Sequence, residues 1–161
     1  MIRRSPRLEG KVAIVTGAGS SGPGVGTGKG ISTLFASEGC NVLLVDRDGS
    51  RAEETLCAIK EDSGQASVFE ADVTRAKDCR RMVEVVEQEY GHLDILVNNV
   101  GITLPGTVVD VTEETWDKVL DVNLKSQMLS SKYAVPAMRN AGGGSIVNIS
   151  SIVAIRSGGA F

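Results

Sequence analysis

The sequence predicts a doubly wound α/β fold built on a parallel sheet, and two observations indicate it. Short apolar runs alternate with helical patterns from Lys11 onward, and four of the runs are almost continuously apolar, as strands buried on both faces of a parallel sheet are. A strand, a helix and a strand repeated in this order give right-handed crossovers. We therefore expect five strands, at 12–15, 42–45, 67–71, 93–98 and 145–150.

Length and composition narrow the class of protein. The 161 residues, 42% apolar and 23% charged, suit one soluble globular domain spanning 1–161. A net charge of −3 argues against nucleic acid as a partner. No apolar run approaches the about 20 residues of a membrane span, and the basic start lacks the apolar segment of a signal peptide. We expect a cytoplasmic protein with no nucleic-acid or membrane partner.

Metal chemistry is not expected. The three cysteines, Cys40, Cys57 and Cys79, are odd in number and lack metal-ligand spacing, which favours reduced side chains. His92 is the only histidine, and a loop position after Gly91 is its simpler role. The sequence thus predicts no metal site.

The first three helices have recognisable ends. The first is expected from Lys29, behind the glycine-rich stretch 16–30. In the second, Ser50 and Glu53 have the spacing of a capping box, and Gly64 can close the C-terminus. The third should stop at Gly91 and bury one apolar face, made of Ala76, Cys79, Met82, Val83, Val86 and Tyr90.

A longer helix is expected from Thr112, whose hydroxyl can cap its N-terminus. It should bend or end near Pro136, and the triple glycine 142–144 should break it before the fifth strand. Apolar residues at helical spacing predict an inward face made of Trp116, Val119, Leu120, Leu124 and Met128.

The glycine-rich stretch 16–30 has the context of a phosphate-binding turn, because a strand precedes it and a helix follows. Gly17, Gly19 and Gly22 match GxGxxG as written. A nucleoside-triphosphate loop ending at Gly28-Lys29 is disfavoured, because Pro23 and Gly30 stand where that motif needs glycine and Ser or Thr. A flexible loop without a ligand is the simpler alternative.

Asp46 ends the second apolar run, at the tip of a strand expected beside the first. A carboxylate there can accept both hydroxyls of an adenosine ribose and would repel a 2′-phosphate, which favours NAD over NADP. The neighbouring Arg47 could partly offset that repulsion. The alternative is that Asp46 is only a turn residue before Gly49.

Polar residues also follow the later strands. Asp72 can take an adenine amino group while Val73 packs on the ring, or it can simply cap the next helix. In 98–101, paired amides can lock neighbouring strand ends together, and a glycine lets the chain pass close to a cofactor. Ser150 and Ser151 offer hydroxyls after the fifth strand, although two serines there are usually only a loop.

Six motifs in order then make the chain similar to the short-chain dehydrogenase/reductase family from about Lys11 to Ser151. They are TGAGxxG…GxG, VDRD, ADVT, NNVG, DVNLK and GSIVNISS. The resemblance implies a Rossmann-type sheet and nicotinamide-dependent oxidation of an alcohol or reduction of a carbonyl compound. The implied cofactor residues are Gly17, Gly26, Gly28, Asp46, Asp72, Val73, Asn99 and Gly101, and the implied catalytic residues are Asn123 and Ser151.

The chain departs from the family pattern in three places. The glycine loop is about five residues longer, which places an insert near 20–25 and makes Gly22 part of it. NNVG replaces the commoner NNAG. The family's Tyr-x-x-x-Lys is absent, because Asp94 and Ala137 stand four residues after the two tyrosines. The sequence is therefore expected to be C-terminally truncated, without the last strands, the tyrosine helix and the substrate lid.

The functional expectation is an NAD(P)-dependent oxidoreductase that transfers a hydride between the cofactor and a small alcohol or carbonyl substrate. With a proton-transferring tyrosine missing, the chain as given should bind cofactor poorly and turn over negligibly. The alternative is a non-catalytic dinucleotide-binding or redox-sensing module. A full-length protein is expected to form a homo-oligomer, by analogy with family members that pair through the helix from Thr112.

Overall fold

A computed structural model describes residues 6–22 and 24–155. Its five parallel strands form one sheet in the order β3-β2-β1-β4-β5. The strands are β1 (Val12–Thr16), β2 (Asn41–Asp46), β3 (Gln65–Glu70), β4 (Ile95–Asn98) and β5 (Ser145–Asn148). The predicted α/β class with a parallel sheet is confirmed, and each strand lies within two residues of its expected start.

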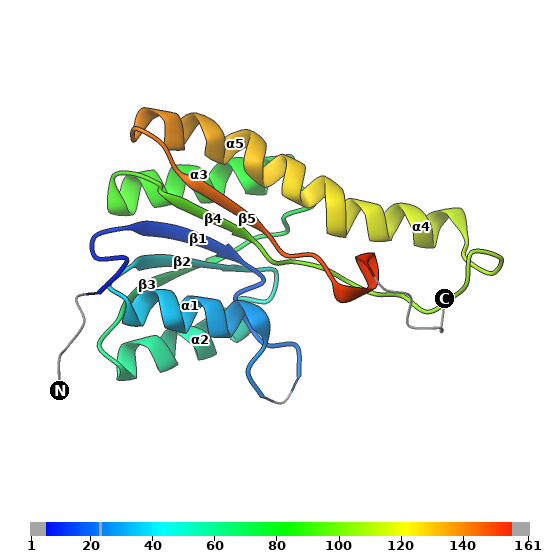
Figure 1. Cartoon of the computed structure of the whole chain (residues 1–161), viewed down its shortest axis with the longest axis horizontal. Coiled ribbons are helices and arrows are strands. Elements are labelled where there is room, and N and C mark those ends of the chain that lie inside the picture. The colour runs from blue at the N-terminus through cyan, green and yellow to red at the C-terminus, as the bar shows by residue number, and fades with distance from the viewer. Residues whose placement is uncertain (1–5, 23, 156–161) are drawn as a thin grey trace.

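Helices cover both faces of the sheet, as Figure 1 shows. One layer contains α1 (Thr27–Ser37) and α2 (Gly49–Glu61), and the other contains α3 (Ala76–Tyr90) and α5 (Ser126–Asn140). A shorter helix, α4 (Glu113–Leu120), leads into α5 through a π-helical turn, and a 3₁₀ turn follows β5. This is the layered arrangement expected when strands and helices alternate along a chain.

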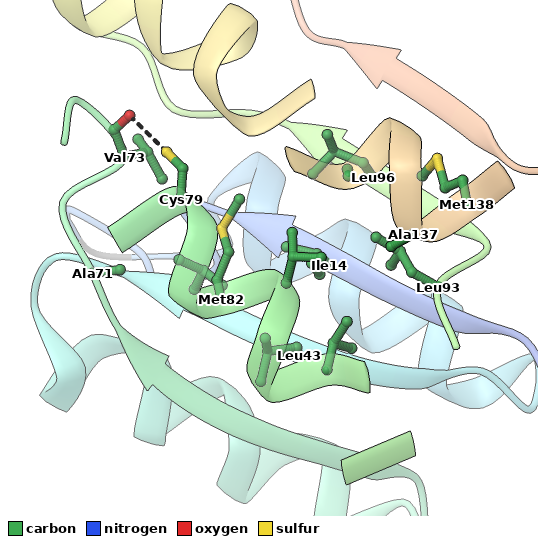
Figure 2. Close-up of a cluster of buried hydrophobic side chains, with 14 of the residues drawn as sticks. Ile14, Leu43, Ala71, Val73, Cys79, Met82, Leu93, Leu96, Ala137 and Met138 are labelled. Atoms are coloured by element: carbon green, nitrogen blue, oxygen red, sulfur yellow. Dashed lines mark hydrogen bonds between the residues drawn. The ribbon is translucent and has the colours of Figure 1, made fainter. Parts of the chain in front are cut away.

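The central strands are buried on both faces, which explains their unbroken apolar sequence. All of β1 and the inner four positions of β2 are buried. Because side chains alternate along a strand, Ile14 and Leu43 pack toward α3 and α5, while Ala13 and Val15 pack toward α1 and α2. Figure 2 shows the first of these cores, where Met82 of α3 packs against the face of the sheet that holds Ile14 and Leu43. The sheet therefore separates two apolar cores.

Two details of α2 differ from the sequence-based expectation. The N-cap residue is Asp48, so Ser50 lies inside the helix and donates to the Asp48 carboxylate at 2.5 Å instead of forming a capping box. At the other end, Ser63 takes the left-handed conformation at φ 62°. The Gly64 N–H then closes the helix by donating to the Ile59 carbonyl at 2.9 Å. Gly64 does close the helix, but the residue before it makes the turn.

Other predicted helix ends are confirmed. Helix α1 begins two residues before Lys29, and α3 ends at Gly91, whose φ of 86° is left-handed. Thr112 caps α4 by accepting from the Thr115 N–H at 3.2 Å. The α5 helix continues through Pro136 and stops before the triple glycine.

The expected inward face of α4 and α5 was wrong. Trp116, Leu120, Leu124 and Met128 are all at least 38% exposed, and α4 has no buried residue. Figure 1 shows why: α4 extends beyond the ends of the strands, so no sheet lies beneath it. The buried face of α5 consists of Ser126, Leu129, Ser130, Ala134, Ala137 and Met138.

Among the described residues, β5 lies at one edge of the sheet. Val147 in that strand is 43% exposed. No helix among the described residues combines the length and the apolar character needed to cross a bilayer.

Candidate functional site

Two adjoining cavities open at the carboxyl ends of the strands, where ligands of doubly wound sheets bind. The first, about 350 Å³, lies between the glycine loop, the end of β2 and the segment after β3. The second, about 410 Å³, lies between the start of α5 and the segment after β5. They share one wall, because both are lined by Thr27, Asn99, Val100, Gly101 and Ile102.

The glycine loop is built around a close approach of Gly17 and Gly28. Gly17 has a left-handed φ of 65°, and a Cβ on Gly28 would lie 1.8 Å from the Gly17 carbonyl oxygen. Neither position can therefore hold a side chain without moving the chain. A Cβ on Gly22, in contrast, would meet nothing within 4 Å. The tight geometry lies at Gly17 and Gly28, and the literal GxGxxG match ending at Gly22 is not its source.

The N-terminus of α1 faces this turn and suits an anion. Gly26 is the N-cap residue, no side chain caps the helix, and its first turn contains no acidic residue. The insert folds back here, since the Gly26 N–H donates to the Ser20 hydroxyl at 2.9 Å. The N–H groups and the positive end of the dipole at α1 are thus directed toward the first cavity, as in phosphate sites.

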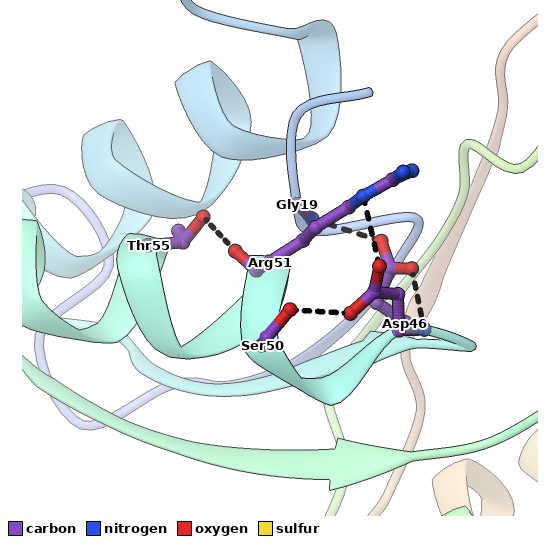
Figure 3. Close-up of polar contacts among 6 residues, drawn as sticks. Gly19, Asp46, Ser50, Arg51 and Thr55 are labelled. Atoms are coloured by element: carbon purple, nitrogen blue, oxygen red, sulfur yellow. Dashed lines mark hydrogen bonds and ion pairs between the residues drawn. The ribbon is translucent and has the colours of Figure 1, made fainter. Parts of the chain in front are cut away.

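Asp46 lines the first cavity at the tip of β2. Its two carboxylate oxygens accept from the Gly19 N–H at 3.0 Å and from the Asp48 N–H at 3.1 Å (Figure 3). These bonds hold the carboxylate beside the glycine loop, and each oxygen keeps further lone pairs for ligand hydroxyls.

Asp72 and Val73 form the far wall of the same cavity. Asp72 accepts from the Thr74 hydroxyl at 2.7 Å and pairs with Arg75 at 3.3 Å. Burial alone would raise the pKa of this carboxyl, but the Thr74 hydrogen bonds and the arginine charges outweigh it and lower the pKa. Asp72 does not cap α3, whose N-cap is Arg75. Val73 is buried against Cys79, whose thiol donates to the Val73 carbonyl (Figure 2).

The expected amide locks are present at the ends of the central strands. Asn98 donates to the Asn148 side chain at 2.9 Å and so ties β4 to β5. The Asn99 amide donates to the carbonyls of Thr16 at 3.1 Å and Gly17 at 3.0 Å, tying β4 to the glycine loop. The floor shared by the two cavities is therefore fixed by side-chain bonds between neighbouring strands.

Asn123 lies in the π-helical turn Asp121–Lys125 and lines the second cavity. Its Oδ1 accepts from the Ile102 N–H at 2.7 Å, and its Nδ2 donates to the Ile102 carbonyl at 2.8 Å. A Cβ on Gly101 would lie 3.6 Å from that Oδ1. The Asn123 side chain thus holds the loop after β4 in place, and single-turn π insertions of this kind are frequent at functional sites.

Ser150 and Ser151 are exposed and line the second cavity, just after β5. Neither Tyr90 nor Tyr133 lines either cavity. Tyr90 instead donates to Ser67 at 2.9 Å, and burial raises its pKa to about 12.

Comparison with known proteins identifies the family of the chain. The short chain dehydrogenase family pattern matches residues 11–160. The chain belongs to the short-chain dehydrogenases. It is 43% identical over 144 residues to an uncharacterized oxidoreductase of Thermotoga maritima, and 40% identical over 149 residues to the 3-oxoacyl-(acyl-carrier-protein) reductase of that organism. These alignments cover 89% and 92% of this chain and 55% and 58% of the relatives.

A crystal structure of a Burkholderia xenovorans protein assigned to the short-chain dehydrogenase/reductases superposes with a TM-score of 0.93 at 44% identity. The match covers 96% of this chain and 59% of that protein. This short-chain dehydrogenase sequence therefore spans rather more than half the length of the relatives it matches.

Several residues at the cavities of this short-chain dehydrogenase were not singled out from sequence, Thr27, Arg51 and Gln127 among them. Thr27 lines both cavities, Arg51 lines the first and Gln127 lines the second. Gln127 stands four residues after Asn123 on a helical segment, so helical spacing could have found it. Arg51 offered no such signal, because its position depends on how α2 packs against Gly19.

His92 lies at the opposite, amino-terminal edge of the sheet. Its Nε2 is 3.0 Å from the Asp94 carboxylate, which also pairs with Lys11 at 2.9 Å. The described residues contain no cluster of His, Cys, Asp and Glu able to hold a metal ion. The histidine of this short-chain dehydrogenase is thus part of a structural ion-pair cluster.

Proposed function

We propose that the chain binds NAD and forms the cofactor half of an oxidoreductase acting on small alcohols or carbonyl compounds. One observation supports this most: the first cavity combines a two-glycine turn at a helix N-terminus with the Asp46 carboxylate. An anion at the helix and a hydroxyl-bearing sugar at the carboxylate are the two ends of a nucleotide diphosphate. The residues present therefore fit a dinucleotide.

In this proposal, Gly17, Gly26 and Gly28 hold the pyrophosphate against α1. Asp46 accepts the hydroxyls of the adenosine ribose, and Asp72 with Val73 contacts the adenine. Asn99 and Gly101 form the floor toward the second cavity, which both residues line. Asp46 favours NAD, because its charge would repel a 2′-phosphate in a partly enclosed site.

When bound, a reduced nicotinamide ring would give a hydride to a carbonyl carbon, and an oxidised ring would accept one from an alcohol carbon. Ser151, at the second cavity, donates its hydroxyl to the substrate oxygen, and Asn123 positions the loop at Ile102. Because neither tyrosine of the sequence lines the cleft, no described phenol is placed to exchange the proton. A cofactor-binding module without turnover is therefore the second candidate function. The reductase named among the relatives suggests a carbonyl substrate for the enzyme.

We also propose that two copies pair through the exposed stripe on α4 and α5. Its four side chains recur every four residues along one helical face, and they are exposed although all are large and apolar. Such a contiguous apolar stripe on a soluble protein is typical of an interface. The members of the stripe are Trp116, Leu120, Leu124 and Met128.

Calorimetric titration of the chain with NADH tests the cofactor proposal. Gly28→Ala should abolish measurable binding, because the new Cβ cannot coexist with the Gly17 carbonyl. Gly22→Ala is the matched control and should bind as the parent does, since nothing lies within 4 Å of its Cβ. Asp46→Ala, with an unchanged melting temperature, should weaken NADH binding about tenfold. Binding by Gly28→Ala equal to the parent's would contradict the proposal.

Turnover separates the two candidate functions. Addition of alcohols and carbonyl compounds to the cofactor-loaded chain should change NADH absorbance if the chain is an enzyme. Cofactor binding without any such change, across short and long substrates, would support the module.

A further inference from the structure

Arg51 lies on the wall of the first cavity, against the glycine loop. The side chain crosses the loop so closely that a Cβ on Gly19 would lie 2.5 Å from the Arg51 Cβ. Figure 3 shows the Arg51 side chain passing Gly19, and both Arg51 and Asp46 line the first cavity. A guanidinium in this position lies beside the residue proposed to receive the adenosine ribose.

The charge of Arg51 is held by a neighbour that does not line the cavity. Its Nε lies 3.0 Å from an Asp48 carboxylate oxygen. The other oxygen of Asp48 accepts from the Ser50 hydroxyl, which fixes the carboxylate in place. Within residues 6–22 and 24–155, Asp48 is the carboxylate paired with Arg51. The N-cap residue of α2 therefore neutralises a cation at the edge of the site.

The Asp46 carboxylate already accepts hydrogen bonds from the backbone. Both of its oxygens accept an N–H, from Gly19 and from Asp48. A second arginine, Arg47, lines the same cavity, and its charge helps to lower the pKa of Asp72. The wall that holds Asp46 thus contains two arginines, and an ion pair there joins Arg51 to Asp48. The charge balance at this wall depends on that pair.

We propose that Asp48 is a specificity-determining residue, which disfavours a 2′-phosphorylated dinucleotide by holding the Arg51 guanidinium in an ion pair. Released from Asp48, Arg51 would have its full set of N–H donors for a phosphate group beside Asp46. This inference rests on the proposed dinucleotide function and adds to it a residue that contacts neither cofactor nor substrate. Asp48 acts through Arg51 and is a positioning residue.

Calorimetry with ADP-ribose and 2′-phospho-ADP-ribose isolates the adenosine end of the site. Asp48→Asn should strengthen 2′-phospho-ADP-ribose binding about tenfold and change ADP-ribose binding by less than about twofold. The double variant D48N/R51Q should lose that gain. Asp62→Asn removes the same charge at the far end of α2 and should leave both affinities unchanged.

Each result has one meaning. A gain that persists in D48N/R51Q would show that Asp48 acts by direct repulsion and would overturn the role of Arg51. No gain in D48N, with ADP-ribose still bound and an unchanged melting temperature, would overturn the inference while leaving the proposed function intact. Failure of the parent chain to bind ADP-ribose would contradict the proposed function, and the inference would fall with it.

Discussion

At each end of β1, one side chain next to β4 connects the two strands: Asp94 at the amino end and Asn99 at the carboxyl end. The two connections differ in chemistry. At the amino end the Asp94 carboxylate accepts from the Val12 N–H at 2.9 Å and pairs with Lys11 and His92. Three donors converge on one anion, and its side chain is only 14% exposed. Charged groups therefore hold this end of β1 against β4.

At the carboxyl end the tie is an amide. Asn99 donates to the carbonyls of Thr16 and Gly17, and its own N–H donates to the Thr16 hydroxyl at 3.1 Å. Acceptors converge here, so an amide nitrogen fits where a carboxylate would be repelled. Because the bonds leave the left-handed turn at Gly17 exposed to the cavity, the same strands support stability at one end and a binding site at the other.

The largest effect is expected from Asn99→Asp, which keeps the shape of the side chain but replaces the donor with an anion. Its oxygens would face two carbonyl oxygens, and we expect a loss of about 3 kcal/mol in the free energy of unfolding. NADH binding should fall with it, because the Gly17 turn is displaced. Urea titration measures the first effect and calorimetry below the melting range measures the second. A fully stable variant would show that the amide tie is dispensable.

The mirror substitution, Asp94→Asn, should destabilise the chain by about 1 to 2 kcal/mol, because the charge opposite Lys11 and His92 is lost while the shape is kept. Asp94 lines neither cavity, so NADH affinity should not change. Reduced affinity in a folded D94N variant would show that the two ends of the strands are coupled.

Lowering the pH should remove the contribution of the Asp94 carboxylate to stability. Burial would raise the pKa of Asp94, but hydrogen bonds from Lys11 and Val12 and nearby positive charge outweigh it and lower the pKa. A lowered folded pKa contributes stability that is present above the unfolded value of about 3.9 and is lost as pH falls through the folded value. The stability difference between the parent and D94N should therefore shrink below about pH 4. A constant difference down to pH 2.5, on the order of the neutral value, would rule out ionisation as its source.

This contrast also separates what sequence could and could not predict. Continuous apolar runs identify β1 and β2 because burial on both faces removes every polar position. Gly17 and Gly28 were named from the family resemblance, and the structure brings them together at the start of α1. The sequence does not predict whether the apolar face of α4 is buried against the sheet, because apolar residues at helical spacing give the same pattern on a buried and on an exposed helix face.

Contacts between segments far apart in the sequence could not be predicted either. The hydrogen bond between Asn123 and Ile102 depends on a π-helical turn that no residue pattern predicts. The Asp48–Arg51 ion pair lies near the site only because α2 packs over Gly19. Two of the donors to Asp94, Lys11 and the Val12 N–H, come from one segment more than 80 residues away, which meets Asp94 only in the folded sheet. The sequence gives the side chain at each position, but it does not give the hydrogen-bond and ion-pair partners of that side chain.

The smallest effect is expected from His92→Gln. The imidazole is 40% exposed and lies on the solvent side of Asp94, whereas Lys11 and the Val12 N–H remain to satisfy the carboxylate. Exposed ion pairs contribute little, so the loss should stay below about 0.5 kcal/mol at neutral pH. Thermal denaturation of H92Q, H92Q/D94N and the single D94N variant forms a double-mutant cycle that measures the pair directly. A coupling as large as the whole D94N effect would make His92, and not the backbone N–H, the main partner at the amino end.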